Sequence, residues 1–469
     1  MTIASTNMSL EELDKLSLLH PVTSIADLQK DGPTIYSDCK GVRLRNRHGR
    51  SVIDMGAGLW CVNVGYGREE IADAAATAIR DLGYVHLFGG TSNEPAIRLA
   101  DKVLSLMREQ TGASHMARVF FGTSGSDAND TAFKLVRYYN NLRGRPGKKK
   151  IISRMGGYHG LTFASGSLTG IAAYHTAFDM PLPDVIHTSC PHFYQFAQDG
   201  ESEEAFTNRM VAEIAGMIER EGADTIAAFI AEPVMGTGGV LLPPEGYFQK
   251  VQKLLTKHDI LFIVDEVITG FGRLGTWFGT GAYDLKPDII NLAKGITSAY
   301  FPLSATVISD AIWETLSEAS PRLGAVMHGF TYSGHPVGSA IALANIGILE
   351  RENLPVRAAD NGAYLLDRLR TRIGDNPFVG DIRGRGLMVG VEYVADKKTR
   401  RPFASATAPH KLIAKLAAEH GVVTRALPFM QVNSFSPPLS ITREEIDEGV
   451  ASYAAALEAA MPSLREMAR

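Results

Sequence analysis

Short apolar runs alternate with helix-like stretches through the middle of the chain. The runs hold β-branched or aromatic residues and lack a polar residue at every second position, a pattern typical of strands buried on both faces. They are Val119–Phe121, Ile151–Ser153, Ile226–Ile230, Ile260–Asp265, Ile289–Leu292 and Ala305–Ile308. The helical stretches between them include Asp127–Tyr139, Glu203–Glu221 and Tyr247–His258. This alternation predicts an α/β fold whose large domain has a mainly parallel sheet covered by helices.

The two ends of the chain carry different patterns. The first 65 residues predict a short helix and a strand pair, namely Leu10–Leu18, Val42–Arg47 and Ser51–Asp54. After Gly334 the pattern predicts a long helix, one strand and a C-terminal helix, namely Val337–Arg351, Leu387–Tyr393 and Arg443–Ala460. We therefore predict an N-terminal segment over 1–65 that is part of a small α+β domain, a large domain over 66–334, and a C-terminal small domain over 335–469.

Composition and charge exclude several classes of protein. The 469 residues are 45% apolar and 21% charged, as in globular proteins. Lys and Arg total 47 against 51 Asp and Glu, so no basic excess exists to bind nucleic acid. The three cysteines fit a reducing compartment and lack metal-ligand spacing, so no metal is expected. The N-terminus is polar and acidic and no apolar run reaches 18 residues, so we expect a cytoplasmic protein with no signal peptide or membrane span.

A glycine- and serine-rich turn follows the run at Val119–Phe121. In a parallel sheet, the loops after the strands form the active site. The backbone N–H groups of Ser124, Gly125 and Ser126 precede a helix, and a helix N-terminus attracts phosphate. The alternative is a capped helix without a ligand, with Ser126 or Asp127 as the cap. The spacing is not the GxGxxG of a dinucleotide-binding turn.

An acid and an amine end two further strands. Asp265 follows Ile260–Val264, and Lys294 follows Ile289–Leu292 closely. A buried lysine is rare unless it is paired or functional, and the structural alternative is a Lys294–Asp265 salt bridge. After Ile151–Ser153 comes a glycine-rich loop with Tyr158, which could lie flat against a planar ligand or simply pack.

Pyridoxal 5′-phosphate explains these features together. The helix N-terminus would bind the phosphate, and Lys294 would form the Schiff base. Asp265 would pair with the pyridine nitrogen, so that the ring serves as an electron sink. Tyr158 would stack on one face of the ring, and Val267 would press on the other.

Four longer motifs carry a resemblance to a known family. They are AFIAEPVMGTGG, IVDEVITGFGR, INLAKGITSAY and FTYSGHP, and the similarity runs from Leu59 to Leu439. The chain resembles class III, ω-type aminotransferases of the aspartate-aminotransferase fold (fold type I), and within them the amine– or ω-amino acid–pyruvate aminotransferases. The resemblance implies pyridoxal 5′-phosphate as cofactor and a homodimer with shared active sites.

The resemblance also assigns residues. It gives the catalytic pair as Lys294 and Asp265. The expected cofactor-binding residues are Ser124, Gly125, Ser126, Tyr158, Asp265, Val267, Lys294 and Thr331, where Thr331 resembles a threonine that reaches the phosphate of the neighbouring subunit. For the substrate it implies Trp60, Tyr158 and Arg425, where Arg425 resembles a mobile arginine that pairs with a carboxylate. Trp60, Phe88 and Phe330 suggest an apolar pocket.

Two positions depart from the family pattern. Ile268 stands where acetylornithine- and 4-aminobutyrate-type relatives usually carry glutamine, which favours other subgroups. Asp127 stands where glutamate is usual, and the charge is kept. The predicted reaction moves an amino group from a primary amine or ω-amino acid to pyruvate or another 2-oxo acid. The alternatives are another reaction on the same scaffold, such as an aminomutase or a decarboxylase, a nicotinamide oxidoreductase, and a non-catalytic binding protein.

Overall fold

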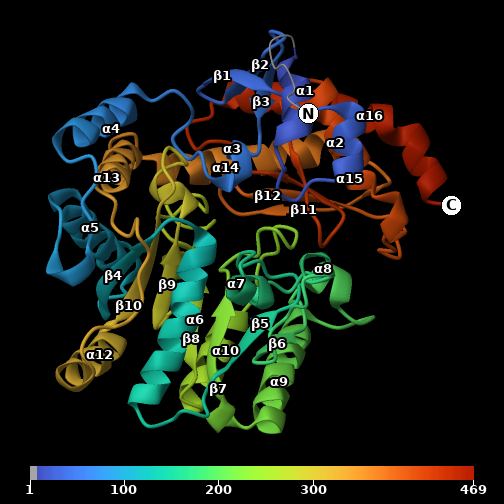
Figure 1. Cartoon of the computed structure of the whole chain (residues 1–469). Helices are drawn as coiled ribbons and strands as arrows, with labels where there is room; N and C mark the ends of the chain where they lie inside the picture. Colours follow the sequence, from blue (N-terminus) through green and yellow to red (C-terminus); the bar gives the residue numbers. More distant parts are fainter. Residues whose placement is uncertain (1–7) are drawn as a thin grey trace.

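A seven-stranded sheet runs through the centre of the chain (Figure 1). Its spatial order is β4 (Met116–Gly122), β10 (Ser304–Ser309), β9 (Ile289–Leu292), β8 (Leu261–Asp265), β7 (Ile226–Ala231), β5 (Lys150–Arg154) and β6 (Val185–Thr188). β10 is antiparallel to both of its neighbours, and the strands from β9 to β6 are all parallel. The computed structural model describes residues 8–469, and it confirms the predicted α/β fold with a mainly parallel sheet.

Both faces of this sheet are buried, which explains why its strands lack alternating polarity. Ile151 packs on one face in a cluster with residues of α6 (Gly125–Leu142) and α12 (Asp310–Leu323). The next residue, Ile152, packs on the other face with α9 (Glu203–Glu221) and α10 (Tyr247–Lys257). A strand between two helical layers needs apolar side chains at every position.

The predicted strands are all present; Ser51–Asp54 and Ile289–Leu292 have the predicted ends, and the ends of the others are shifted. The four-residue strand β6 was not predicted, since its His187 and Thr188 interrupt the apolar pattern. α6 begins at Gly125 rather than Asp127, because Ser124 is its N-cap. Sequence alone also gave no direction for β10, the one antiparallel strand of this sheet.

The two ends of the chain meet in a second sheet. It contains β1 (Tyr36–Lys40), β2 (Arg43–Asn46), β3 (Ser51–Asp54) and β13 (Val422–Val423). β13 comes from the C-terminal part and pairs in parallel with β3. A third sheet has the order β11 (Val379–Gly384), β12 (Val389–Tyr393), β15 (Val432–Phe435) and β14 (Arg425–Ala426). The N- and C-terminal parts therefore pack together, and the domain limits at 65 and 334 stay a prediction.

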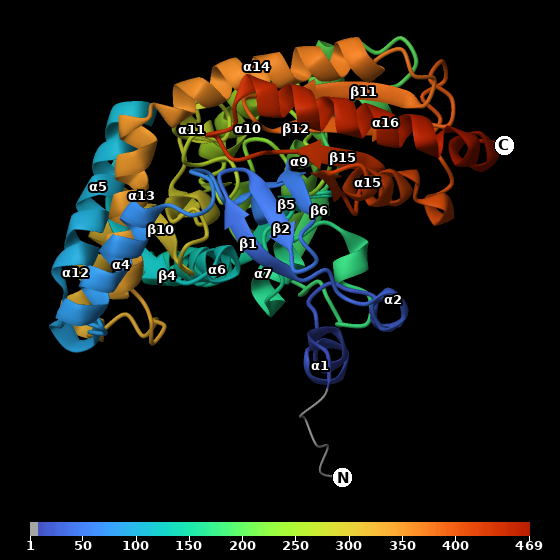
Figure 2. The ribbon, with the colours of Figure 1, turned by 90° about the horizontal axis from the view of Figure 1, so that it is seen from above.

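The remaining helices cover the edges and the upper layer. They are α1 (Leu10–Ser17), α2 (Ile25–Asp31), α3 (Ala57–Trp60), α4 (Glu69–Asp81), α5 (Glu94–Thr111), α7 (Phe163–Leu168), α8 (Phe193–Phe196), α11 (Gly279–Ala282), α13 (Pro336–Arg351), α14 (Leu354–Ile373), α15 (Pro409–Glu419) and α16 (Arg443–Met467). α14 and α16 run side by side, whereas α1 and α2 project from the body and bury no residue (Figure 2). Over residues 8–469, no helix combines the length and apolarity that a membrane span requires.

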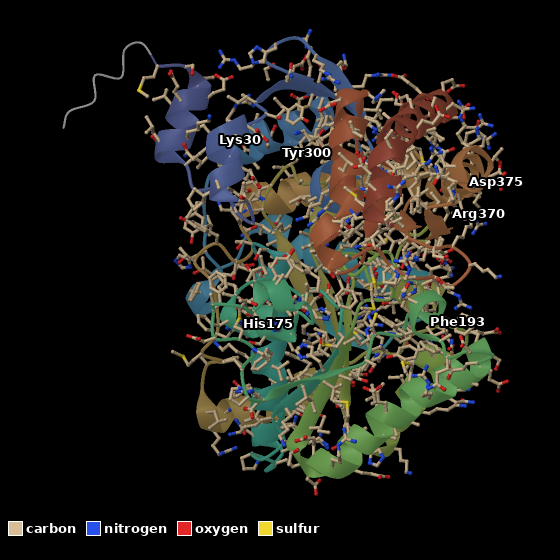
Figure 3. All side chains as sticks on the ribbon, turned by 90° about the vertical axis from the view of Figure 1, so that its right-hand side faces the viewer. Lys30, His175, Phe193, Tyr300, Arg370 and Asp375 are labelled. Atoms are coloured by element: carbon tan, nitrogen blue, oxygen red, sulfur yellow. The ribbon has the colours of Figure 1, made fainter. Side chains whose placement is uncertain are left out.

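Tyr300 ties the N-terminal part to the large sheet's loops. Its hydroxyl donates to the carbonyl oxygen of Gly65 at 2.8 Å and accepts from the backbone N–H of Arg68 at 2.9 Å. Figure 3 shows Tyr300 in the upper half of the molecule, while Arg370 and Asp375 lie at the surface near the end of α14. The loop after β9 is thus anchored to the segment that leads into α4.

Candidate active site

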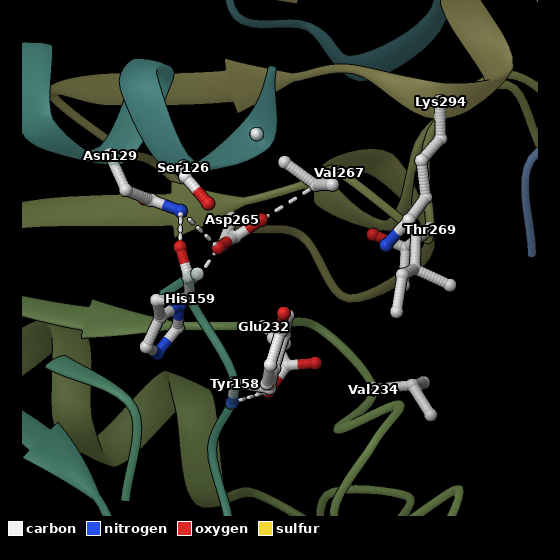
Figure 4. A pocket seen from close by; sticks show the side chains of 13 residues that line it. Ser126, Asn129, Tyr158, His159, Glu232, Val234, Asp265, Val267, Thr269 and Lys294 are labelled. Carbon is white, nitrogen blue, oxygen red and sulfur yellow. Dashed lines mark hydrogen bonds and ion pairs between the residues drawn. The ribbon is translucent and has the colours of Figure 1, made fainter. Parts of the chain in front are cut away.

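A pocket opens at the carboxyl ends of the parallel strands (Figure 4). Its cavity volume is about 150 Å³. Its lining comes from the ends of β5, β7, β8 and β9 and from the start of α6. The lining residues are Gly125, Ser126, Asn129, Tyr158, His159, Gly160, Glu232, Val234, Asp265, Val267, Ile268, Thr269 and Lys294.

Lys294 brings an amine without a counter-ion into the pocket. It follows β9 with a φ of 46°, a left-handed conformation that points the side chain out of the strand direction. In the part of the chain that the structure describes, no carboxylate oxygen lies within 4.0 Å of its Nζ, so the structural Lys294–Asp265 salt bridge is absent. Burial lowers the pKa of Lys294, with Arg425 acting in the same direction. Its amine therefore becomes neutral, and nucleophilic, below the usual pH.

Asp265 is held rigidly at the end of β8. It is 3% exposed, and its Oδ1 accepts from the Val267 N–H at 3.0 Å. Oδ2 lies 2.8 Å from Asn129 Nδ2 and 2.8 Å from His159 Nδ1. Asn291 Nδ2 donates to Asn129 Oδ1 at 2.8 Å, which fixes the orientation of the Asn129 amide. Asn129 and His159 were not predicted as partners of Asp265, because Asn129 comes from α6 and His159 from the loop after β5.

The turn before α6 combines a cap with free N–H groups. Ser124 is the N-cap and forms a capping box with Asp127, so the prediction of Ser126 or Asp127 as the cap is wrong. Asp127 also accepts from the hydroxyls of Thr123 and Ser304, each at 2.7 Å. Across residues 8–469, the N–H groups of Gly125 and Ser126 find no acceptor in the protein. Both residues line the pocket and could bind phosphate, whereas the Ser124 N–H already donates to Asp127 Oδ2 at 3.0 Å.

Tyr158 and Val267 lie on either side of Asp265 in the close view (Figure 4). Burial raises the pKa of Tyr158 to about 12, so its phenol stays protonated. A Cβ on Gly125 would lie 2.9 Å from Val267 Cγ1, so glycine is needed for the α6 turn to approach Val267. A planar group between Tyr158 and Val267 would have an aromatic ring on one face and a branched aliphatic group on the other.

Glu232 is a pocket carboxylate to which no role was assigned from sequence. It follows β7, is 3% exposed, and accepts from the N–H of Tyr158 at 3.1 Å and of Gly236 at 2.8 Å. Burial raises the pKa of Glu232. An acid directly after a buried strand was the signal that identified Asp265, and the same rule applied to Ile226–Ile230 would have found Glu232.

Trp60 and Arg425 meet at the edge of the pocket. Trp60 is 1% exposed and packs in one cluster with Val234, Ile268 and Met388. The Arg425 guanidinium carbon lies 4.7 Å from the centre of the Trp60 ring. Arg425 is half-buried on β14, outside the large sheet, and no carboxylate of residues 8–469 lies within 4.0 Å of it. Sequence alone would place Arg425 at the surface, and the structure places it on Trp60.

Three other predicted residues lie away from this pocket. Thr331 is exposed, and its carbonyl oxygen accepts from the Tyr84 hydroxyl at 2.5 Å. Phe88 lines a separate surface groove, and Phe330 packs edge-on against Phe120 at 6.1 Å. Within one chain Phe88 and Phe330 therefore lie apart from Trp60, beside β4, and the apolar pocket expected from the three residues stays a prediction for the homodimer.

The pocket residues fit pyridoxal 5′-phosphate. They supply an amine with no counter-ion, a buried carboxylate, free N–H groups at a helix N-terminus, and a tyrosine opposite a valine. Among the described residues, no group of three or more His, Cys, Asp and Glu side chains is arranged to hold a metal ion.

Comparison with known proteins gives consistent matches over the whole fold. The family model for aminotransferase class-III matches residues 26–457. An uncharacterized aminotransferase y4uB of Sinorhizobium fredii is 45% identical over 99% of this chain and 98% of its own length. A diaminobutyrate–2-oxoglutarate transaminase of Halomonas elongata is 46% identical over 95% of each chain. The solved omega transaminase of Pseudomonas jessenii in complex with PMP is 42% identical, with a TM-score of 0.94 over 97% of this chain and 99% of its own.

Proposed function

Because the chain belongs to the class III aminotransferases, we propose that it transfers an amino group from a primary amine or an ω-amino acid to pyruvate. It is an enzyme that depends on pyridoxal 5′-phosphate. When bound, this cofactor accepts the amino group in one half-reaction, returns it in the next, and withdraws electrons from the reacting carbon. The family match removes the nicotinamide oxidoreductase from consideration.

Each pocket residue has its own role toward the cofactor or the reacting carbon. Lys294 attaches the cofactor and then carries a proton to and from the reacting carbon as general base and acid. Asp265 keeps a proton on the pyridine nitrogen, and its hydrogen bonds to Asn129 and His159 fix the direction of its carboxylate. Gly125 and Ser126 bind the phosphate through their N–H groups, with Ser124 shaping the turn. Tyr158 and Val267 confine the ring.

The proposal of pyruvate as acceptor rests on the guanidinium of Arg425. This guanidinium lies on Trp60, and no carboxylate of residues 8–469 pairs with it, so it can pair bidentately with a substrate carboxylate. One guanidinium matches one carboxylate, which favours a monocarboxylic acceptor such as pyruvate over a dicarboxylic one. The cation–π contact contributes about 0.5–2 kcal/mol, less than a charge-assisted bidentate pair, so Arg425 can leave Trp60 when the acid arrives.

The donor side of the pocket is apolar. Trp60, Val234 and Ile268 pack together there, and Ile268 offers no hydrogen bond to a polar substituent. An amine with an alkyl or aryl substituent would remove this apolar surface from water on binding. The donor half-reaction needs no carboxylate on the substrate, and Arg425 then stays on Trp60.

A homodimer would complete the site. Thr331 is exposed on one chain, beside a groove lined by Phe88, Phe120 and Met327. Large apolar side chains that face outward together mark an interaction surface. We infer that a second copy covers this face and that Thr331 then reaches the partner's phosphate site.

A donor panel tests this function. Purified enzyme with pyridoxal 5′-phosphate receives pyruvate and one donor at a time, from aryl and alkyl amines to diamines and ω-amino acids, and alanine is measured. We expect alanine with at least one amine that has no carboxylate. If no donor yields alanine, but 2-oxoglutarate yields glutamate, the acceptor assignment is wrong. If the ω-amino acids of the panel isomerise or lose carbon dioxide without forming alanine, an aminomutase or decarboxylase replaces the proposal.

A further inference from the structure

The loop that carries Trp60 contains the irregular four-residue helix α3, whose backbone is strained. Ala57, Gly58 and Trp60 have φ values of 44°, 65° and 58°. Residues with a Cβ seldom occupy this left-handed region, and two of the three have one. Such a conformation persists only where surrounding contacts hold it in place. The contacts of this loop therefore decide where the Trp60 ring lies.

Asp54 supplies several of these contacts. It ends β3 directly before the loop and is 1% exposed. Its Oδ1 accepts from the Gly56 N–H at 2.9 Å, and its Oδ2 accepts from the Gly58 N–H at 2.7 Å and from the Tyr66 hydroxyl at 2.7 Å. No cationic side chain of residues 8–469 lies within 4.0 Å of this carboxylate. A buried carboxylate needs hydrogen-bond donors. Two of the three donors to Asp54 are backbone N–H groups of the Trp60 loop, and the third is the Tyr66 hydroxyl.

The same strand end is joined to the strand that leads to Arg425. Asp54 pairs with Val423 in the parallel β3–β13 ladder, and the Met55 N–H donates to the Val423 carbonyl oxygen at 3.0 Å. Val423 precedes Arg425 by two residues. Asp54 thus lies where the Trp60 loop and the Arg425 strand begin. The Trp60 ring and the Arg425 guanidinium meet again in the pocket wall, 4.7 Å apart.

We propose that Asp54 is a positioning residue that sets donor selectivity by holding Trp60 against the pocket. With Trp60 fixed, the wall formed with Val234 and Ile268 limits the size of the donor's substituent. Without the Asp54 carboxylate, the strained loop relaxes, Trp60 moves, and larger donors enter. The inference rests on the proposed function, because it takes the Trp60 wall as the donor side.

Asp54→Asn tests the inference with a change of nearly equal shape. Asparagine keeps one acceptor oxygen and therefore cannot accept from both loop N–H groups and the Tyr66 hydroxyl. We measure kcat/KM with 2-aminopropane and with 1-phenylbutylamine, using pyruvate as acceptor. The ratio of the bulky to the small donor should rise at least tenfold. In a Trp60→Ala background the same substitution should change the ratio less than twofold, because Asp54 acts through Trp60.

Tryptophan fluorescence gives a readout apart from activity. The chain holds three tryptophans, and replacing Trp277 and Trp313 with Phe leaves Trp60 alone. Acrylamide should quench Trp60 weakly in the holoenzyme, since its side chain is 1% exposed. Asp54→Asn should raise the quenching constant at least threefold. If this variant does not fold, Tyr66→Phe removes one of the three hydrogen bonds and should shift both readouts in the same direction.

Asp288→Asn is the matched control. Asp288 is a half-buried carboxylate that accepts from the Phe262 N–H at 2.8 Å, at the opposite end of the large sheet. The Asp288→Asn substitution should lower the melting temperature without changing the ratio of kcat/KM for the two donors or the acrylamide quenching constant. An unchanged ratio and unchanged quenching in Asp54→Asn overturn the inference, as does a ratio change that persists in Trp60→Ala. If the wild type aminates no pyruvate, the proposed function fails, and quenching still decides whether Asp54 positions Trp60.

Discussion

His159 Nδ1 lies 2.8 Å from Oδ2 of Asp265, and both side chains are buried. Asn129 of α6 donates to the same oxygen, so two donors from separate elements fix the carboxylate that faces the pocket. A carboxylate held this way needs no reorientation during the reaction, which is the condition for strong electrostatic stabilisation.

Asp265→Ala should slow the amine half-reaction by at least three powers of ten. Without the carboxylate charge, the pyridine nitrogen loses its proton and the ring withdraws electrons less strongly. A thousandfold lower rate corresponds to an activation barrier higher by about 4 kcal/mol. Single-turnover absorbance of the loaded enzyme measures the rate. Asp288→Asn should stay within twofold of the wild type, and an Asp265→Ala rate within tenfold of the wild type contradicts the assignment.

Lys294 should carry the cofactor covalently. Borohydride treatment of the loaded enzyme should add the mass of the reduced cofactor to the tryptic peptide that contains Lys294, as read by mass spectrometry. Lys294→Ala should show no added mass on any peptide. A label on another lysine of the wild type shows that the site is wrongly assigned.

The reactivity of Lys294 should titrate below that of an ordinary lysine. Burial disfavours its charged form and lowers its pKa, so the neutral amine is present from a lower pH upward. Labelling of the cofactor-free enzyme with an amine reagent, followed peptide by peptide across pH 6–11, should rise for Lys294 at a lower pH than for free Nα-acetyl-lysine. Equal labelling midpoints for Lys294 and this reference show that burial does not lower the pKa of Lys294.

Arg425→Ala should separate the two half-reactions. Pyruvate use should weaken by about one to two orders of magnitude, because a bidentate charge-assisted contact contributes roughly 1.5–3 kcal/mol. The reaction with a simple monoamine should change less than threefold. Arg385→Ala is the control, since Arg385 stacks on Tyr283 at 4.9 Å and should affect neither half-reaction. Equal slowing of both half-reactions shows that Arg425 is structural.

Thr331→Val should weaken cofactor binding without unfolding the chain. Thr331 is exposed and its hydroxyl has no partner among the described residues, so its loss costs a single chain little. In the proposed dimer, Thr331→Val removes a contact to the partner's phosphate site. Cofactor binding and dimer formation should stabilise each other by linkage. Sedimentation equilibrium with and without cofactor checks this. A fully active monomer overturns the shared site.

The sequence predicted those site residues that follow local rules. Asp265 and Lys294 each come just after an apolar run, and a buried run fixes both the strand and the edge of the sheet where it ends. Gly125 and Ser126 likewise come after a buried apolar run, Val119–Phe121. The same rule would also have covered Glu232, had every strand end been read in the same way.

Other parts of the site depend on contacts between distant segments. Trp60 and Arg425 are far apart in sequence, and neither has a local pattern that predicts their contact. The pairing of Asp265 with His159 depends on how the loops after β5 and β8 lie in space. Phe88 and Phe330 lie apart from Trp60 within one chain, and an aromatic residue in a loop does not reveal which side of the molecule the loop follows.

The parallel pairing of β3 with β13 also bears on synthesis at the ribosome. Residues 53–54 leave the ribosome early, and their partners 422–423 follow almost at the end. During that interval β3 has one unpaired edge, and contacts of such sequence separation form slowly. The central sheet can assemble from its own segment meanwhile. The substrate-facing wall therefore forms only late in synthesis, and a ribosome stalled before residue 422 would display a cofactor cradle without it.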